Sequence, residues 1–165
     1  MRTRLWVTGL LALGFFVALG VIDGKLKDTG GPGIVPFEVE FTSDHARETL
    51  GKWGPGGRDD AKLSLWLDYG FLIAYGAFFS LAARALVDAL GWRRWAFLVP
   101  LPIAAAISDA IENANLLMTI GQDGDQPWPL LGGIFASIKF VLLTPVQVFV
   151  LVGFVVWLSR RARRR

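Results

Sequence analysis

A short polar segment, residues 108–115, concentrates the side chains that could carry out chemistry. Asp109, Glu112 and Asn113 stand at positions i, i+3 and i+4, a spacing that puts them on one face of a helix. Bulky apolar residues, Ile107 and Ile111 among them, occupy the opposite face. Two carboxyl groups on one face can act as a general acid and a general base, bind a cation, or hold the polar end of a ligand.

Three further polar residues in other apolar segments are expected at a similar depth. A helix rises about 1.5 Å per residue, so Lys139 and Glu112 both fall about 12–13 Å from the same end of antiparallel helices. Asp68 falls nearer that end, and Tyr75 lies on the same stripe of its helix, below the carboxylate. The sequence therefore predicts six ion- or ligand-binding candidates: Asp68, Tyr75, Asp109, Glu112, Asn113 and Lys139.

The candidates include three acids and only one base. A charge at the centre of a membrane costs at least ~2.5–3.5 kcal/mol, and Lys139 can offset the charge of one acid. We therefore expect at least one remaining acid to carry a proton, or to bind a cation or a ligand's donor groups. Glu112, matched in depth to Lys139, is the expected ionised partner, and Asp109 is the expected protonated acid. The alternative is a buried ion pair that only fixes the register of the helices.

Composition identifies the elements that must position these residues. The chain has 165 residues, 53% hydrophobic and 19% charged, against roughly 25% charged in soluble domains. Four apolar segments, 5–22, 63–83, 95–120 and 130–158, contain only four charged residues, all named above. Each segment reaches the ~17–25 residues that a helix needs to cross a bilayer, and helices satisfy their own backbone there. The predicted fold is all-α: one four-helix transmembrane bundle over residues 1–165.

The charges outside these segments predict the orientation. Ten Arg lie near the two termini and between the second and third segments, with one acid, Asp88. The other connections, 23–62 and 121–129, hold ten acidic and six basic residues. Because basic residues near span ends stay in the cytoplasm, we expect both termini inside, in a bacterial inner membrane. The lipid bilayer, and not nucleic acid, is then the expected partner of the basic tail.

The first apolar segment is expected to be a span and the first long connection a cap. The segment's 18 residues exceed the ~7–15 of a signal-peptide core. Residues 23–62 are apolar and patterned enough to fold as an ordered extracytoplasmic cap over the bundle. The predicted local elements are an extended segment at 35–41, a short helix from Ser43 or Asp44 that ends before Gly51, a turn at 54–57, and a helix capped by Asp59 or Asp60.

Several kinds of chemistry lack the residues they need. The sequence has no cysteine and one histidine, His45, so it offers no disulfide, thiolate nucleophile or paired-histidine haem site. The glycine clusters are not followed by the Lys-Ser/Thr of a phosphate-binding loop. We expect no cofactor and no metal site.

Four short motifs follow one another along the chain in an order that resembles a group of bacterial membrane proteins. Phe37-Glu38, Trp53-Gly54, Asp68-Tyr-Gly-Phe71 and Asp109-Ala-Ile-Glu-Asn113 follow one another along the chain. This pattern resembles an uncharacterised group of small bacterial four-span membrane proteins with a D-x-x-E-N third span. A fainter likeness is to the four-span sterol isomerases, which also place acids inside a bundle. The resemblance implies the four-span fold and no particular activity.

Three functions fit these residues. The leading hypothesis is a small membrane protein whose carboxylate and lysine cluster binds or transfers a proton, a cation or a lipid-like molecule. The first alternative is a membrane enzyme that uses paired carboxylates for acid–base chemistry on an apolar substrate. The second alternative is an accessory subunit with a membrane protein partner, in which the cluster is structural.

Overall fold

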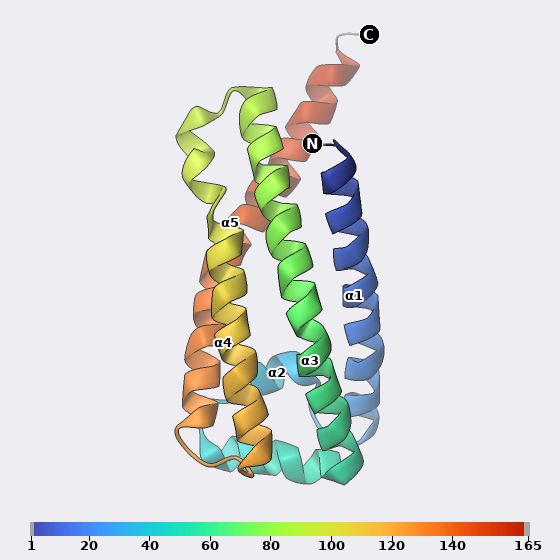
Figure 1. Ribbon diagram of the computed structural model, residues 1–165, viewed down its shortest axis with the longest axis vertical. Helices are drawn as coiled ribbons and strands as arrows, with labels where there is room; N and C mark the ends of the chain where they lie inside the picture. Colours follow the sequence, from blue (N-terminus) through green and yellow to red (C-terminus); the bar gives the residue numbers. More distant parts are fainter. Residues whose placement is uncertain (1, 164–165) are drawn as a thin grey trace.

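The computed structural model describes residues 2–163, and every regular element in that range is helical. The elements are α1 (Arg2–Asp28), α2 (Ile34–Glu38), α3 (Ser43–Leu90), the 3-10 helix η1 (Arg93–Leu98), α4 (Leu101–Gly121) and α5 (Trp128–Ala162). Figure 1 shows α1, α3, α4 and α5 running along the long axis, with α2 and the start of α3 at one end. The predicted all-α fold is confirmed.

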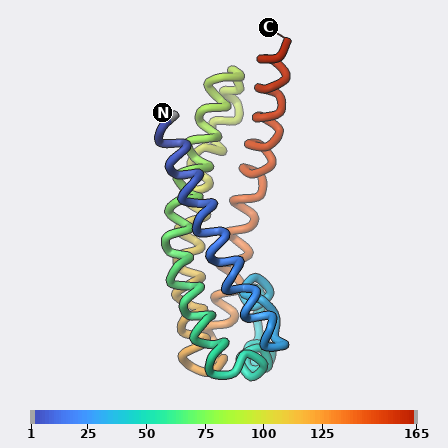
Figure 2. The backbone as a smooth tube through the Cα atoms, turned by 90° about the vertical axis from the view of Figure 1, so that its right-hand side faces the viewer, coloured from blue at the N-terminus to red at the C-terminus, as the bar shows by residue number. Residues whose placement is uncertain are grey.

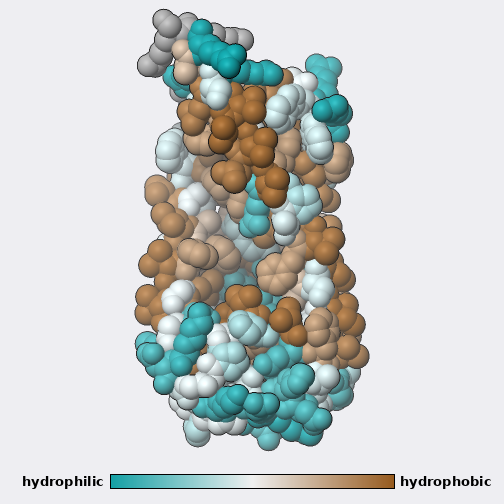
Figure 3. Space-filling model, turned by 180° about the vertical axis from the view of Figure 1, so that it is seen from behind, coloured by the Kyte–Doolittle hydropathy of each residue, from teal (hydrophilic) through white to brown (hydrophobic). Residues whose placement is uncertain are grey.

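Four helical stretches within residues 2–163, one of them η1 together with α4, are long and apolar enough to cross a membrane. They cover Thr3–Asp28, Ser43–Leu90, Arg93–Gly121 and Trp128–Ala162. Each contains one of the four predicted apolar segments and extends beyond it, because helical hydrogen bonding continues into the polar flanks. Figure 3 shows hydrophobic residues over the middle of the molecule and hydrophilic residues gathered at both ends.

α3 is the central helix of the bundle, in contact with α1, α4 and α5, and α4 also packs along α5. Small residues let these helices approach closely. A Cβ added at Gly76 of α3 would lie 3.2 Å from the Cβ of Ala106 on α4. A Cβ at Gly132 of α5 would lie 3.0 Å from Leu116 of α4. α1 packs mainly on α3, and Figure 2 shows it on the outside of the bundle.

The segment 29–53, which we call the cap, is ordered and covers one end of the bundle. Phe37 of α2 stacks on Trp53 with ring centroids 4.7 Å apart, and the Trp53 indole N–H donates to the Pro32 carbonyl at 2.8 Å. Phe37 and Trp53 join Leu26 and Leu116 in one buried apolar cluster. An ordered segment therefore covers this end as predicted, on a core shared with α1 and α4, but over 29–53 and not the whole of 23–62, because α1 continues to Asp28 and α3 resumes after Gly54.

The prediction of an extended segment at 35–41 is wrong, because residues 34–38 form α2. The Ile34 N–H donates to the Asp23 carboxylate of α1 at 2.7 Å, which caps the first turn. Pro36 lies inside that turn, where its missing N–H has no partner to lose. Tertiary contacts thus override the alternating pattern, and α2 directs Phe37 and Glu38 into the molecule.

The boundaries predicted for the next helix are also wrong in detail. Thr42, and not Ser43 or Asp44, caps it by accepting from the His45 N–H at 3.4 Å. The helix runs past Gly51 and breaks only at Gly54, whose φ of 61° lies in the left-handed region, which glycine adopts without strain. Asp59 and Asp60, expected to cap the N-terminus of the next helix, lie inside the part of α3 that follows Gly54, which we call its second arm.

Candidate functional site

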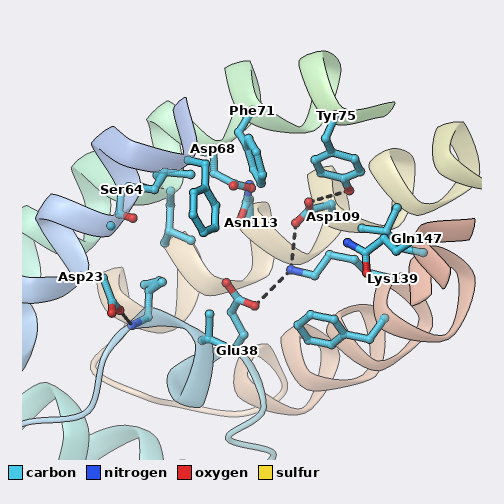
Figure 4. A pocket seen from close by; sticks show the side chains of 18 of the residues that line it. Asp23, Glu38, Ser64, Asp68, Phe71, Tyr75, Asp109, Asn113, Lys139 and Gln147 are labelled. Atoms are coloured by element: carbon cyan, nitrogen blue, oxygen red, sulfur yellow. Dashed lines mark hydrogen bonds and ion pairs between the residues drawn. The ribbon is translucent and has the colours of Figure 1, made fainter. Parts of the chain in front are cut away.

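Lys139 of α5 lies at the centre of three carboxyl groups, which with it form what we call the lysine cluster. Its Nζ donates to Glu38 Oε2 at 3.1 Å, to Asp109 Oδ1 at 3.1 Å and to Glu112 Oε1 at 3.0 Å. All four residues are at most 9% exposed. Figure 4 shows Glu38 and Asp109 approaching Lys139 from different elements. Lys139 thus contacts Glu112, its expected partner, and also Asp109.

A second set of hydrogen bonds extends the cluster along α3. The Tyr75 hydroxyl donates to Asp109 Oδ2 at 2.8 Å, and Asn113 Nδ2 donates to Asp68 Oδ2 at 2.7 Å. All six residues predicted from the sequence therefore lie in one region, as two bonded groups. Within residues 2–163, Asp68 receives this one hydrogen bond and forms no ion pair, so its carboxylate has no cationic partner.

Local helix geometry explains how α4 and α5 present these side chains. Asp109 and Glu112 are one turn apart on α4, and both are buried. The Ser108 hydroxyl donates to the Phe135 carbonyl of α5 at 2.8 Å, which fixes α4 beside α5 next to Lys139. The side chains predicted to face away from the cluster, Ile107 and Ile111, are exposed. The predicted inward face of this helix is confirmed.

Glu38 is the member of the site that sequence reasoning missed. It lies in the connection expected to be extended, where Glu38 and Glu40 look equivalent in the sequence. The structure separates them, because Glu38 enters the lysine cluster while Glu40 accepts from the Thr49 hydroxyl at 2.6 Å within the cap. Only the helical turn of α2, set by its cap on Asp23, decides which acid turns inward.

Glu38 brings the site to four carboxyl groups with one ammonium group. Burial raises the pKa of Glu38 above its ordinary value, against the opposing effect of Lys139. Asp109 accepts a hydrogen bond at each of its oxygens, from Tyr75 and from Lys139. Glu38 therefore enlarges the surplus of acids over Lys139 and joins the acids that can carry the proton which this surplus requires.

A cavity of about 390 Å³ lies beside the cluster, between α1 and α5. Its polar floor is formed by Glu38, Asp68, Asp109, Asn113 and Lys139. Its walls are mainly apolar and aromatic, with Phe16, Leu19, Phe71, Phe79, Phe140 and Leu143 among the lining residues. Figure 3 shows the hollow on this face of the molecule, with hydrophilic atoms below a hydrophobic rim.

The lysine cluster differs from a metal site in the group at its centre. Within residues 2–163, no group of three His, Asp or Glu side chains has the arrangement of a metal site. Lys139 occupies the position between the carboxylates that a cation would need.

Comparison with protein-family models, with curated proteins and with solved structures finds no match for this chain.

Proposed function

We propose that this chain is an integral protein of a bacterial inner membrane, with α1, the second arm of α3, α4 and α5 as its four spans. Support comes from the length and hydropathy of these helices and from the exposed apolar side chains along them. The arginines at the end where α1 begins and α5 ends favour a cytoplasmic location for that end. The cap then lies on the outer side.

We further propose that the protein binds a lipid-like small molecule in the cavity between α1 and α5. The observation that carries this proposal is the cavity itself, which has apolar walls and a floor of charged groups. This combination fits an amphiphile, because apolar walls hold a chain while a few polar groups orient a head. Ionisable residues within a membrane also mark binding or transfer sites by default.

A structural role for the lysine cluster is the second candidate. Lys139 uses all three of its N–H donors on carboxylates of α2 and α4, as a clasp between these elements would. The two roles are compatible, since the clasp can build the floor of the cavity. The same saturation disfavours the enzymatic alternative, because Asp109 and Glu112 are both engaged by Lys139.

The test uses two glycines of α1 that differ in their relation to the cavity. Gly20 lines it and Gly14 does not, while a Cβ at either position would meet no atom within 4 Å. Gly20→Leu should therefore fill the cavity mouth, and Gly14→Leu is the matched control. Mass spectrometry of the protein purified from its membrane should show a co-purifying amphiphile that is lost in Gly20→Leu and kept in Gly14→Leu. Equal retention by both variants would contradict the proposal.

A further inference from the structure

The hydrogen-bonding capacity at the floor of the cavity restricts the head group that can bind there. An ammonium group has three donors, and Lys139 directs them to Glu38, Asp109 and Glu112. The Tyr75 hydroxyl is likewise used, on Asp109. The strongest donors of the site are therefore occupied by protein acceptors. Among the described residues that line the cavity, Lys139 is the only Lys or Arg, so a ligand with an anionic head would meet carboxylates without a free cation to receive it.

Asp68 is the carboxylate that remains available. It lines the cavity, and the hydrogen bond that it accepts from Asn113 reaches Oδ2. Figure 4 shows Asp68 between Asn113 and Phe71, away from Lys139. With four carboxyl groups facing one ammonium, the surroundings of Asp68 favour positive charge.

The aromatic side chains that line the cavity together with Asp68 favour the same ligand. The ring centroid of Phe71 lies 5.1 Å from that of Tyr75 and 6.4 Å from that of Phe16. All three rings line the cavity. Aromatic faces attract cations within about 6 Å of their centroids. The site already contains one such pair, since Lys139 Nζ lies 4.9 Å from the centroid of Phe140.

We propose that the ligand is an amphiphile with a cationic, ammonium-type head, which binds Asp68 among these aromatic rings while its chain leaves the cavity between α1 and α5. This inference rests on the proposed lipid-binding function and adds the charge of the head group. Entry from the membrane follows from the position of the opening, because the helices on either side of it carry exposed apolar side chains, such as Phe16 and Val148.

Chain-matched probes test the head group. Binding of dodecyltrimethylammonium, dodecanol and dodecanoate to the protein in nanodiscs is compared, with empty nanodiscs as the correction for partitioning. The ammonium probe should bind at least about tenfold more tightly than dodecanoate, which corresponds to about 1.4 kcal/mol. Tetramethylammonium, which has the head without the chain, should bind far more weakly if the ligand comes from the membrane. Equally tight binding of tetramethylammonium would overturn the amphiphile and favour a soluble cation.

Two variants assign the effect to Asp68. Asp68→Asn should lower the affinity for dodecyltrimethylammonium about tenfold and leave that for dodecanol unchanged. Asp60→Asn, the same change on the same helix outside the cavity, should alter neither. Tightest binding of dodecanoate would overturn the cationic head and leave the proposed function intact. Absence of binding of every probe, with no difference between Gly20→Leu and Gly14→Leu, would overturn the proposed function itself. The ranking of probes on the unmodified protein stands even if Asp68→Asn does not fold.

Discussion

At the scale of single residues, the site depends on how one ammonium group is shared. Lys139 contacts one acid from α2 and two from α4, so its removal leaves several carboxyl groups facing one another. Taking away one partner of a buried pair is more costly than replacing the pair, because an uncompensated charge remains. We therefore expect the cost in stability of losing Lys139 to come from the three surrounding acids together, and not from one of them.

We expect Lys139 and Glu112 to be strongly coupled in their effects on the free energy of unfolding. Lys139→Met should lower the free energy of unfolding by about 3–5 kcal/mol, and combining it with Glu112→Gln should cost less than the sum of the single changes. Unfolding in mixed detergent micelles gives all four values of the cycle. Lys62→Met removes a partly exposed lysine paired to Asp59 and should cost less than about 1 kcal/mol. If the free energies of unfolding were additive in this cycle and in the same cycle made with Asp109→Asn, the result would argue against the cluster.

A second prediction concerns the pH dependence that Glu38 confers. Burial raises its pKa above the ordinary value of 4.5, so above pH 4.5 the folded protein retains a proton that the unfolded chain has released. The stability linked to Glu38 is thus fully present below pH 4.5 and is lost as pH rises through the raised pKa. Thermal unfolding between pH 4.5 and 9 should show a smaller loss of stability in Glu38→Gln than in the unmodified protein.

Glu48 provides the control for this experiment. It is exposed, and its hydrogen bond from Lys52 lowers its pKa, so its contribution has the opposite sign and falls at acid pH. Glu48→Gln should leave the loss of stability above pH 4.5 unchanged. If Glu38→Gln and Glu48→Gln gave the same pH profile, the buried location of Glu38 would have no energetic consequence.

At the scale of elements, the position of α2 decides whether the site is complete. This five-residue helix is too short to be stable by itself. It is held by Asp23, which caps Ile34, and by the packing of Phe37 on Trp53. The cap and the lysine cluster are therefore linked, because the same helix that packs into the cap places Glu38 on Lys139.

We predict that Asp23→Ala releases α2 from the lysine cluster. The change removes the acceptor of the Ile34 N–H and the ion pair of Asp23 with Lys27, with an expected cost of about 1 kcal/mol for the lost helix cap. Hydrogen exchange of the amides in 34–40 should become faster. Asp28→Ala removes an exposed acid from the same helix, and exchange in this segment should then stay as it is in the unmodified protein. Unchanged exchange in Asp23→Ala would show that packing alone holds α2.

The elements also show what the sequence can and cannot specify. The long apolar helices follow from local hydropathy, and Asp109, Glu112 and Asn113 share a face because helix periodicity is a local property. Lys139 could be matched to them because helical rise is constant. α2 could not be predicted, since its cap comes from Asp23 on another helix and its alternation resembles a strand. Helix breaks are intermediate in this respect: the glycines at 54–57 predict a turn, but packing confines it to Gly54.

At the scale of the whole molecule, the two ends differ in structure and in charge. The cap end carries two ion pairs to the α4–α5 connection, one from Arg47 of the cap to Asp125 and one from Arg58 of α3 to Asp123. The opposite end carries the connection from α3 to η1 and the beginnings and ends of α1 and α5. Arginine dominates that end. The two ends would therefore interact differently with a bilayer that surrounds the apolar middle of the molecule.

This asymmetry predicts one orientation, which single cysteines can test because the chain has none of its own. Ser43 lies at the start of α3 and Gln122 just after α4, both at the cap end, and cysteines there should react with an impermeant thiol reagent added to intact cells. Cysteines at Asp88 and Ala162, exposed positions at the arginine-rich end, should react only after the membrane is opened. Arginine near span ends remains on the cytoplasmic side, so the reverse pattern would invert the orientation. Labelling of all four positions in intact cells would contradict insertion of the four helices, and with it the membrane entry of the ligand.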